Sequence, residues 1–107
     1  MTKIHQKEIE NITKQIVKKY KPEKIILYGS FAYGKPNEDS DVDLLIIKST
    51  QKTRTKRHLE VDRMLLDRTV PLDILVYTPQ EIKKRLLLGD FFIKDIIQQG
   101  KILYAEK

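Results

Sequence analysis

Three short apolar runs do most to constrain the fold of this chain. They are Lys24–Tyr28 (KIILY), residues 41–47 (DVDLLII) and residues 70–77 (VPLDILVY). Runs of five to eight residues rich in Ile, Leu and Val predict short, buried strands. Two of the runs also contain aspartates, so the predicted sheet carries carboxylates as well as core side chains.

Helical patterns separate these strands. Residues 1–20 carry Ile, Val and Tyr side chains at helical spacing and are expected to form an amphipathic helix that ends before Pro22. A turn is expected over residues 29–34, followed by a loop over 35–40. A second helix, with a less regular apolar pattern, is expected over about 54–67.

The C-terminal third repeats the alternation. Thr78-Pro79 is a typical helix start, and Glu81 is spaced to close a capping box. Another helix is expected from about residue 90 to just before Gly100, with a last short strand over 101–105. The whole order predicts one domain, residues 1–107, of α/β (α+β) class with a small mixed sheet packed with helices.

Composition excludes several kinds of site. The chain has 107 residues and no cysteine, which rules out disulfides, thiolate metal sites and cysteine nucleophiles. No apolar run approaches the roughly 18 residues of a membrane span, and the N-terminus lacks the apolar core of a secretory signal. These features predict a cytoplasmic protein.

The net charge of +6 has two interpretations. It favours an anionic ligand or an acidic partner, but lysines spread along the chain also fit a solvated surface. The densest basic stretch, residues 52–57, has no aromatic residue that could stack on bases, which disfavours direct nucleic-acid binding.

The clearest chemical pattern is a pair of aspartates, Asp41 and Asp43, at the start of the second predicted strand. Alternate residues of a strand share a face, so the two carboxylates are expected side by side. Two such carboxylates repel each other unless a cation lies between them. Mg²⁺ is commonly bound by one or two carboxylates together with substrate phosphates.

Asp73 interrupts the third apolar run and is costly to bury without a partner. If its strand neighbours the second one, Asp73 can join the other two carboxylates. Three carboxylates can hold two metal ions, or Asp73 can act as a general base beside one ion. The sequence leaves both roles open.

Gly29-Ser30 directly follows the first predicted strand. Glycine permits unusual backbone angles, and serine can cap a following helical turn whose N–H groups then face an anion. Alone, this dipeptide indicates only a turn. Ten residues separate it from Asp41, and this ordered combination indicates a site for a nucleoside triphosphate.

This combination resembles the DNA polymerase β-like nucleotidyltransferase superfamily, and more closely its minimal nucleotidyltransferase branch, which includes antitoxins paired with HEPN-domain toxins. The resemblance covers nearly the whole chain. It implies that Gly29 and Ser30 hold the phosphates of ATP and that Asp41 and Asp43 bind Mg²⁺. Asp73 would be the third carboxylate, as a metal ligand or an activator of the acceptor hydroxyl.

The resemblance further implies transfer of AMP from ATP to a tyrosine of a HEPN toxin, with one or two Mg²⁺ ions. Two departures stand out. Many relatives have arginine after Gly-Ser where this chain has Phe31, and the accessory domains of larger relatives are missing. Acceptor recognition is therefore expected from an exposed surface or a partner chain.

Two other functions stay open. The chain could neutralise a toxin by binding alone, or it could transfer a nucleotide to a small molecule or RNA. The apolar stretch over residues 91–97 is expected in the core, but any exposed part is a candidate for self-association or toxin binding. Oligomeric state and base preference are also left open.

Overall fold

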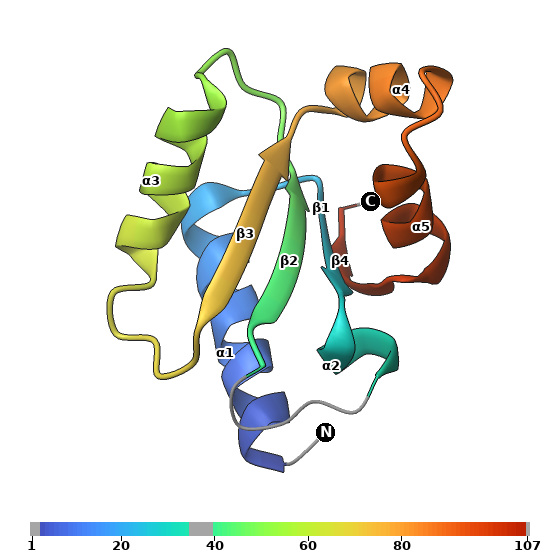
Figure 1. Cartoon of the computed structure of the whole chain (residues 1–107). Helices are drawn as coiled ribbons and strands as arrows, with labels where there is room; N and C mark the ends of the chain where they lie inside the picture. Colours follow the sequence, from blue (N-terminus) through green and yellow to red (C-terminus); the bar gives the residue numbers. More distant parts are fainter. Residues whose placement is uncertain (1–2, 35–39, 107) are drawn as a thin grey trace.

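The computed structural model describes residues 3–34 and 40–106 (Figure 1). In chain order, its elements are α1 (Lys3–Tyr20), β1 (Lys24–Tyr28), α2 (Ser30–Tyr33), β2 (Val42–Ile47), α3 (Arg54–Met64), β3 (Leu72–Tyr77), α4 (Pro79–Leu87), α5 (Phe91–Gln99) and β4 (Lys101–Ala105).

The four strands form one mixed sheet in the order β3-β2-β1-β4. Strand β1 pairs antiparallel with both β2 and β4, whereas β2 and β3 run parallel. The parallel pair is joined by a crossover through α3, as parallel strands require. The predicted α+β class and the small mixed sheet are both confirmed.

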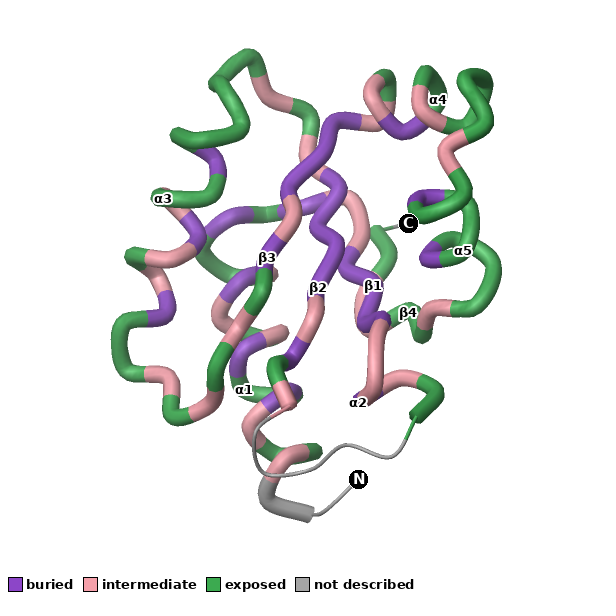
Figure 2. The backbone as a smooth tube through the Cα atoms, viewed as in Figure 1, coloured by how far each residue is buried: buried purple, intermediate pink, exposed green. Residues whose placement is uncertain are grey.

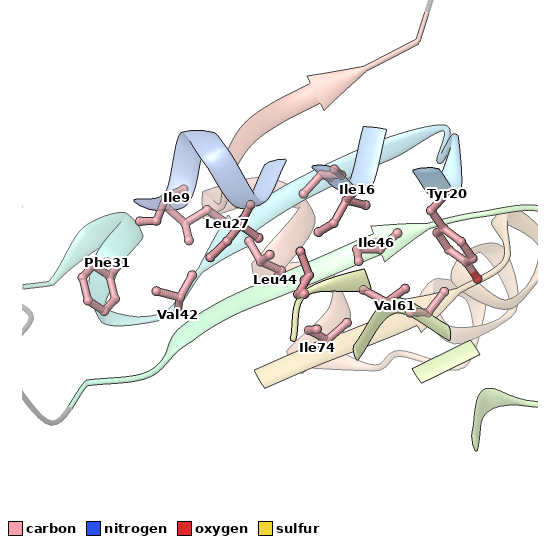
Figure 3. Packing of buried hydrophobic residues seen from close by; sticks show 14 residues of the cluster. Ile9, Ile16, Tyr20, Leu27, Phe31, Val42, Leu44, Ile46, Val61 and Ile74 are labelled. Atoms are coloured by element: carbon pink, nitrogen blue, oxygen red, sulfur yellow. The ribbon is translucent and has the colours of Figure 1, made fainter. Parts of the chain in front are cut away.

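One face of the sheet packs against α1 and α3. Figure 3 shows side chains from α1, such as Ile9 and Ile16, meeting Leu44 and Ile46 of β2 and Val61 of α3. Val42, Leu44 and Ile46 all lie in this core, as the alternation of β2 predicts. The central strands are buried along most of their length (Figure 2).

The opposite face of the sheet packs against α4 and α5. Ile26 and Leu45 meet Ile93 and Ile96 of α5 there. Gly100, which follows α5, lets the chain return closely over β1: a Cβ at this residue would lie 2.5 Å from Cγ2 of Ile26 and 2.5 Å from the Ile96 carbonyl oxygen. Asp43, Leu45 and Ile47 alternate with Val42, Leu44 and Ile46, so Asp43 belongs to this α5 face.

Three boundaries differ from those expected: β2 begins at Val42 rather than at residue 41, β3 begins at Leu72 rather than at residue 70, and α3 ends early. Helix α3 ends at Met64 rather than near residue 67, because Leu65 leaves helical geometry and inserts into the core. A hydrogen bond from the Arg68 N–H to the Leu65 carbonyl oxygen, 3.1 Å, closes a turn there. Residues 30–33 form the short helix α2 within the predicted turn. The predicted loop over 35–40 lies outside the described residues except for Ser40.

The helix starts expected at Thr78 and Asp90 are confirmed. The Thr78 hydroxyl accepts from the Glu81 N–H at 3.1 Å, and the Glu81 carboxylate accepts from the Thr78 N–H at 2.8 Å. Asp90 accepts from the Ile93 N–H. In the described part of the chain, no helix is long and apolar enough to cross a membrane.

Candidate active site

The turn after β1 lies directly against the carboxylate of Asp43. Tyr28, the last residue of β1, is the register partner of Asp43 in β2. Gly29 follows with φ 75° and ψ −158°, a conformation that is essentially restricted to glycine. A Cβ at residue 29 would overlap Oδ2 of Asp43 and lie 3.1 Å from its Cγ. The glycine of the predicted phosphate turn and the second aspartate therefore meet in space.

Asp43 and Asp73 are register partners in the parallel pair β2–β3. Residues paired in this way point to the same face, on strands about 4.8 Å apart. The condition stated from the sequence, that the third strand neighbours the second, is therefore met, and Asp73 lies beside Asp43. Asp73 is exposed near the start of edge strand β3, so its carboxylate does not bear the cost of burial.

Asp41 precedes β2 rather than belonging to it. The strand begins at Val42, where the Val42 N–H donates to the Pro71 carbonyl oxygen at 2.9 Å. The strand alternation that was used to orient Asp41 therefore does not reach it, and its side chain is exposed. Asp41 nevertheless lies close enough to Asp43 to influence its ionisation.

Burial raises the pKa of Asp43, and the negative charges of Asp73 and Asp41 raise it further. Burial also raises the pKa of Tyr28 well above its ordinary value, with Asp73 and Asp43 adding to the effect. Burial is the largest cause of each shift, and the negative charges of the neighbouring aspartates add to it. A cation would relieve that repulsion, and carboxylate oxygens are the ligands that Mg²⁺ prefers.

The carboxylates are not preassembled as a three-ligand cluster. In residues 3–34 and 40–106, no group of three or more His, Cys, Asp or Glu side chains is gathered so that it could hold a metal ion. The register pair Asp43–Asp73 is the centre of the site, with Asp41 at its margin. A carboxylate pair fits Mg²⁺ when substrate phosphates and water complete the coordination.

Ser30 is the first residue of α2, not its cap. Gly29 occupies the N-cap position without a side-chain hydrogen bond, and its carbonyl oxygen accepts from the N–H groups of Ala32 and Tyr33 at 3.0 and 3.3 Å. The expectation of a serine cap was therefore wrong, because the tight turn starts one residue earlier. Gly34 closes α2, donating its N–H to the Ser30 carbonyl oxygen at 2.9 Å.

Phe31 is buried in the core between the sheet and α1. Its ring packs edge-on against His5, with the ring centroids 5.2 Å apart. The Phe31 side chain therefore packs in the core next to the turn and is not exposed for contact with a ligand.

An aromatic contact at the rim of the site was not anticipated. Phe92 of α5 packs edge-on against Tyr28, with ring centroids 5.7 Å apart. Strand alternation places Tyr28 on the α5 face, but only the tertiary structure brings residue 92 to it. The contact joins the start of α5 to the strand position opposite Asp43.

A family comparison agrees with this geometry. The family described as "Polymerase beta, Nucleotidyltransferase" matches residues 10–107. The chain belongs to this family. Nucleotidyl transfer is therefore its class of reaction, and the turn and carboxylates described above lie within the matched residues.

One protein of known sequence and two crystal structures are similar to this nucleotidyltransferase. A protein of Methanocaldococcus jannaschii named "Putative protein adenylyltransferase" is 27% identical over 104 residues, covering 92% of this chain and 97% of that protein. A crystal structure of a "putative nucleotidyltransferase" from Sulfolobus solfataricus matches with a TM-score of 0.66 at 18% identity, covering 94% and 79% of the two chains. A toxin–antitoxin crystal structure with AMP-PNP matches with a TM-score of 0.64 at 18% identity, covering 92% and 74%. The two structures share the fold with this chain.

Proposed function

We propose that this nucleotidyltransferase transfers AMP from ATP to a tyrosine hydroxyl of a partner HEPN-domain toxin and thereby acts as its antitoxin. One observation carries the proposal: the Gly29 turn lies against Asp43, which is in register with Asp73. A phosphate-accommodating turn and a carboxylate pair are thus adjacent at one end of the sheet.

Each residue has a distinct role in this proposal. Gly29 and Ser30 border the triphosphate, and the absence of a side chain at position 29 lets this turn lie against the Asp43 carboxylate. Asp41 and Asp43 hold Mg²⁺, as one or two ions, with Asp73 as the third carboxylate. Bound Mg²⁺ supplies neutralisation of negative charge on the phosphate oxygens.

The reaction is an in-line displacement at the α-phosphorus. A bond forms between the tyrosine oxygen and phosphorus, the bond from phosphorus to the bridging oxygen of the β-phosphate breaks, and pyrophosphate leaves with that electron pair. The tyrosine proton passes to a carboxylate or to solvent. Asp73 suits the role of proton acceptor because its side chain is exposed, whereas Asp43 is partly buried.

Two relatives support the choice of acceptor and partner. The Methanocaldococcus jannaschii protein is named as a protein adenylyltransferase, and its length is almost fully spanned by this chain. The toxin–antitoxin structure contains AMP-PNP, an analogue of ATP. A protein acceptor and an adenine nucleotide are therefore the first to test.

The test is incubation of the purified chain with ATP, Mg²⁺ and the protein encoded by the adjacent gene, followed by intact-mass measurement of that protein. An increase by one or more AMP units supports the proposal, provided that Asp43→Asn abolishes it. The matched control is Glu10→Gln on the exposed face of α1, which should retain transfer. A stable complex without any mass increase would contradict transfer and favour neutralisation by binding.

A further inference from the structure

The junction of α4 and α5 exposes an unusual amount of apolar side chain. Leu87 is 88% exposed, Leu88 73%, Phe91 82% and Phe92 53%. We call these four residues the α4–α5 apolar surface. Exposed apolar groups that gather in one place mark interaction sites more often than scattered ones do. Figure 2 shows the exposed stretch at the end of α4 and the start of α5.

This exposure is not required by the packing of the two helices. Ile82 of α4, with Ile93 and Ile96 of α5, already fills the core on this face of the sheet. The four exposed residues contribute instead to the outer surface. Phe91 and Phe92 line a shallow, open groove of about 530 Å³ together with Lys94, Asp95 and Gln98.

The α4–α5 apolar surface reaches the candidate active site through one contact. Phe92 packs against Tyr28, and Tyr28 is the register partner of Asp43. A protein that covers Phe91 and Phe92 would therefore lie at the rim of the carboxylate pair, where an acceptor side chain has to approach.

Charge around the surface indicates the chemistry of its partner. Leu88 shares a second groove with Arg54, Lys84 and Arg85, whose single carboxylate, Glu81, is already hydrogen-bonded to Arg57. Arg85 pairs with Asp90 at 3.5 Å, so Arg54 and Lys84 give that groove its surplus of positive charge. An apolar centre with a cationic border complements an apolar segment flanked by acidic residues.

We propose that the α4–α5 apolar surface docks the acceptor protein through an apolar segment flanked by Asp or Glu, and so delivers the acceptor hydroxyl past Tyr28 to the carboxylates. This inference rests on the proposed function, since it names the docking surface of the same site. It assigns binding to Leu87, Leu88, Phe91 and Phe92 and leaves the chemistry to the carboxylates.

The test uses the full chain, with the protein encoded by the adjacent gene as the probe. The double variant Leu87→Ser/Phe91→Ser removes two highly exposed side chains and spares Phe92, which contacts Tyr28. We expect its affinity for the probe to fall about tenfold or more, because apolar anchors dominate such interfaces. The matched control is Leu66→Ser, which removes a 78% exposed leucine just after α3 and should leave affinity unchanged.

Charge reversal tests the border of the surface. Lys84→Glu should slow association with the probe and reduce its dependence on salt concentration. Lys7→Glu on α1 makes the same charge change elsewhere and should alter the association rate much less. Equal effects of the two variants would attribute the interaction to net charge and overturn the proposed cationic border.

Separate measurements distinguish this inference from the proposed function. ATP binding without the probe should be unchanged in Leu87→Ser/Phe91→Ser, and Asp43→Asn should still bind the probe while failing to transfer AMP. Wild-type affinity in the double variant would overturn the docking surface, whether or not transfer occurs. The docking surface would also be overturned if the wild-type chain were a dimer, and if the double variant became a monomer without any loss of affinity for the probe.

Discussion

Gly29 and Asp43 are in contact across the end of the sheet, so closely that a methyl group at residue 29 would overlap the Asp43 carboxylate. Gly29 belongs to the Gly-Ser part of the sequence motif, and Asp43 belongs to its Asp-x-Asp part. The antiparallel pairing of β1 with β2 brings them together, because Tyr28 is paired with Asp43 and Gly29 follows it. Their contact makes the turn and the carboxylate one structural unit.

Gly29→Ala should therefore impair both activity and stability. The variant forces a side chain into a glycine-only conformation, at a cost of about 1–3 kcal/mol, and displaces the Asp43 carboxylate. We expect AMP transfer to fall about 100-fold or more. Urea unfolding and intact-mass assays measure the two effects.

Gly89→Ala is the matched control for this variant. Gly89 also has a positive φ, 78°, but no atom lies within 4 Å of a Cβ built there. It should lose about 1–2 kcal/mol of stability through backbone strain alone while retaining ATP binding, which does not involve the α4–α5 apolar surface. Equal loss of ATP binding in both variants would show that the Gly29–Asp43 contact is unimportant.

Asp43→Asn should reduce activity without reducing stability. Burial, Asp73 and Asp41 raise the pKa of Asp43, so its ionised form is less favourable in the folded chain than in the unfolded chain. Removing this charge should leave the free energy of unfolding at pH 7 unchanged or higher, although transfer falls about 100-fold or more. Thermal unfolding of the variant and the wild type side by side is the measurement. A strongly destabilised Asp43→Asn would contradict the interpretation that these charges repel one another.

Glu81 should make the chain sensitive to acid. Burial alone would raise the pKa of Glu81. The hydrogen bonds from Arg57 and the Thr78 N–H, with the charges of Arg57 and Arg54, outweigh burial and lower the pKa. A lowered pKa stabilises the fold above the unfolded-state value of about 4.3, and the gain is lost as pH falls through the folded-state value.

Glu81→Gln should accordingly flatten the pH dependence of unfolding below about pH 4.3. The difference should not exceed about 1 kcal/mol, because the Glu81 side chain remains partly exposed. Urea midpoints measured from pH 3 to pH 7 test this, with Glu10→Gln on the exposed face of α1 as control. If Glu10→Gln flattens the profile as much, the Arg57 interaction does not explain it.

Gly100→Ala should destabilise the packing of α5 on the sheet. The added methyl would lie 2.5 Å from Cγ2 of Ile26 and 2.5 Å from the Ile96 carbonyl oxygen. Overpacking of this kind costs about 1–3 kcal/mol. The urea midpoint should fall with an unchanged slope, whereas Gln99→Ala, at an exposed neighbour, should leave the midpoint nearly unchanged.

The elements of the sheet and the helix caps could be predicted because they depend on local patterns. The alternation of Val42, Leu44 and Ile46 placed these residues in the core, and Thr78 with Glu81 marked a helix start. Both signals lie within a few residues of sequence.

Features that depend on tertiary packing could not be predicted in this way. Leu65 ends α3 because it fills the core. The α2 turn begins at Gly29 because its positive φ fits beside Asp43, so Ser30 is left inside the helix. The contact of Phe92 with Tyr28 joins residues 64 positions apart, which no local pattern reveals.

The register of Asp43 with Asp73 has a consequence for how this chain can change during evolution. Because side chains alternate along a strand, a shift of one residue in β2 or β3 would turn one carboxylate to the opposite face. Length changes in the connection before Leu72 leave that pairing intact, whereas a single-residue insertion within either strand would break it. Lineages of this protein should therefore accumulate insertions and deletions in that connection while the strand lengths stay fixed.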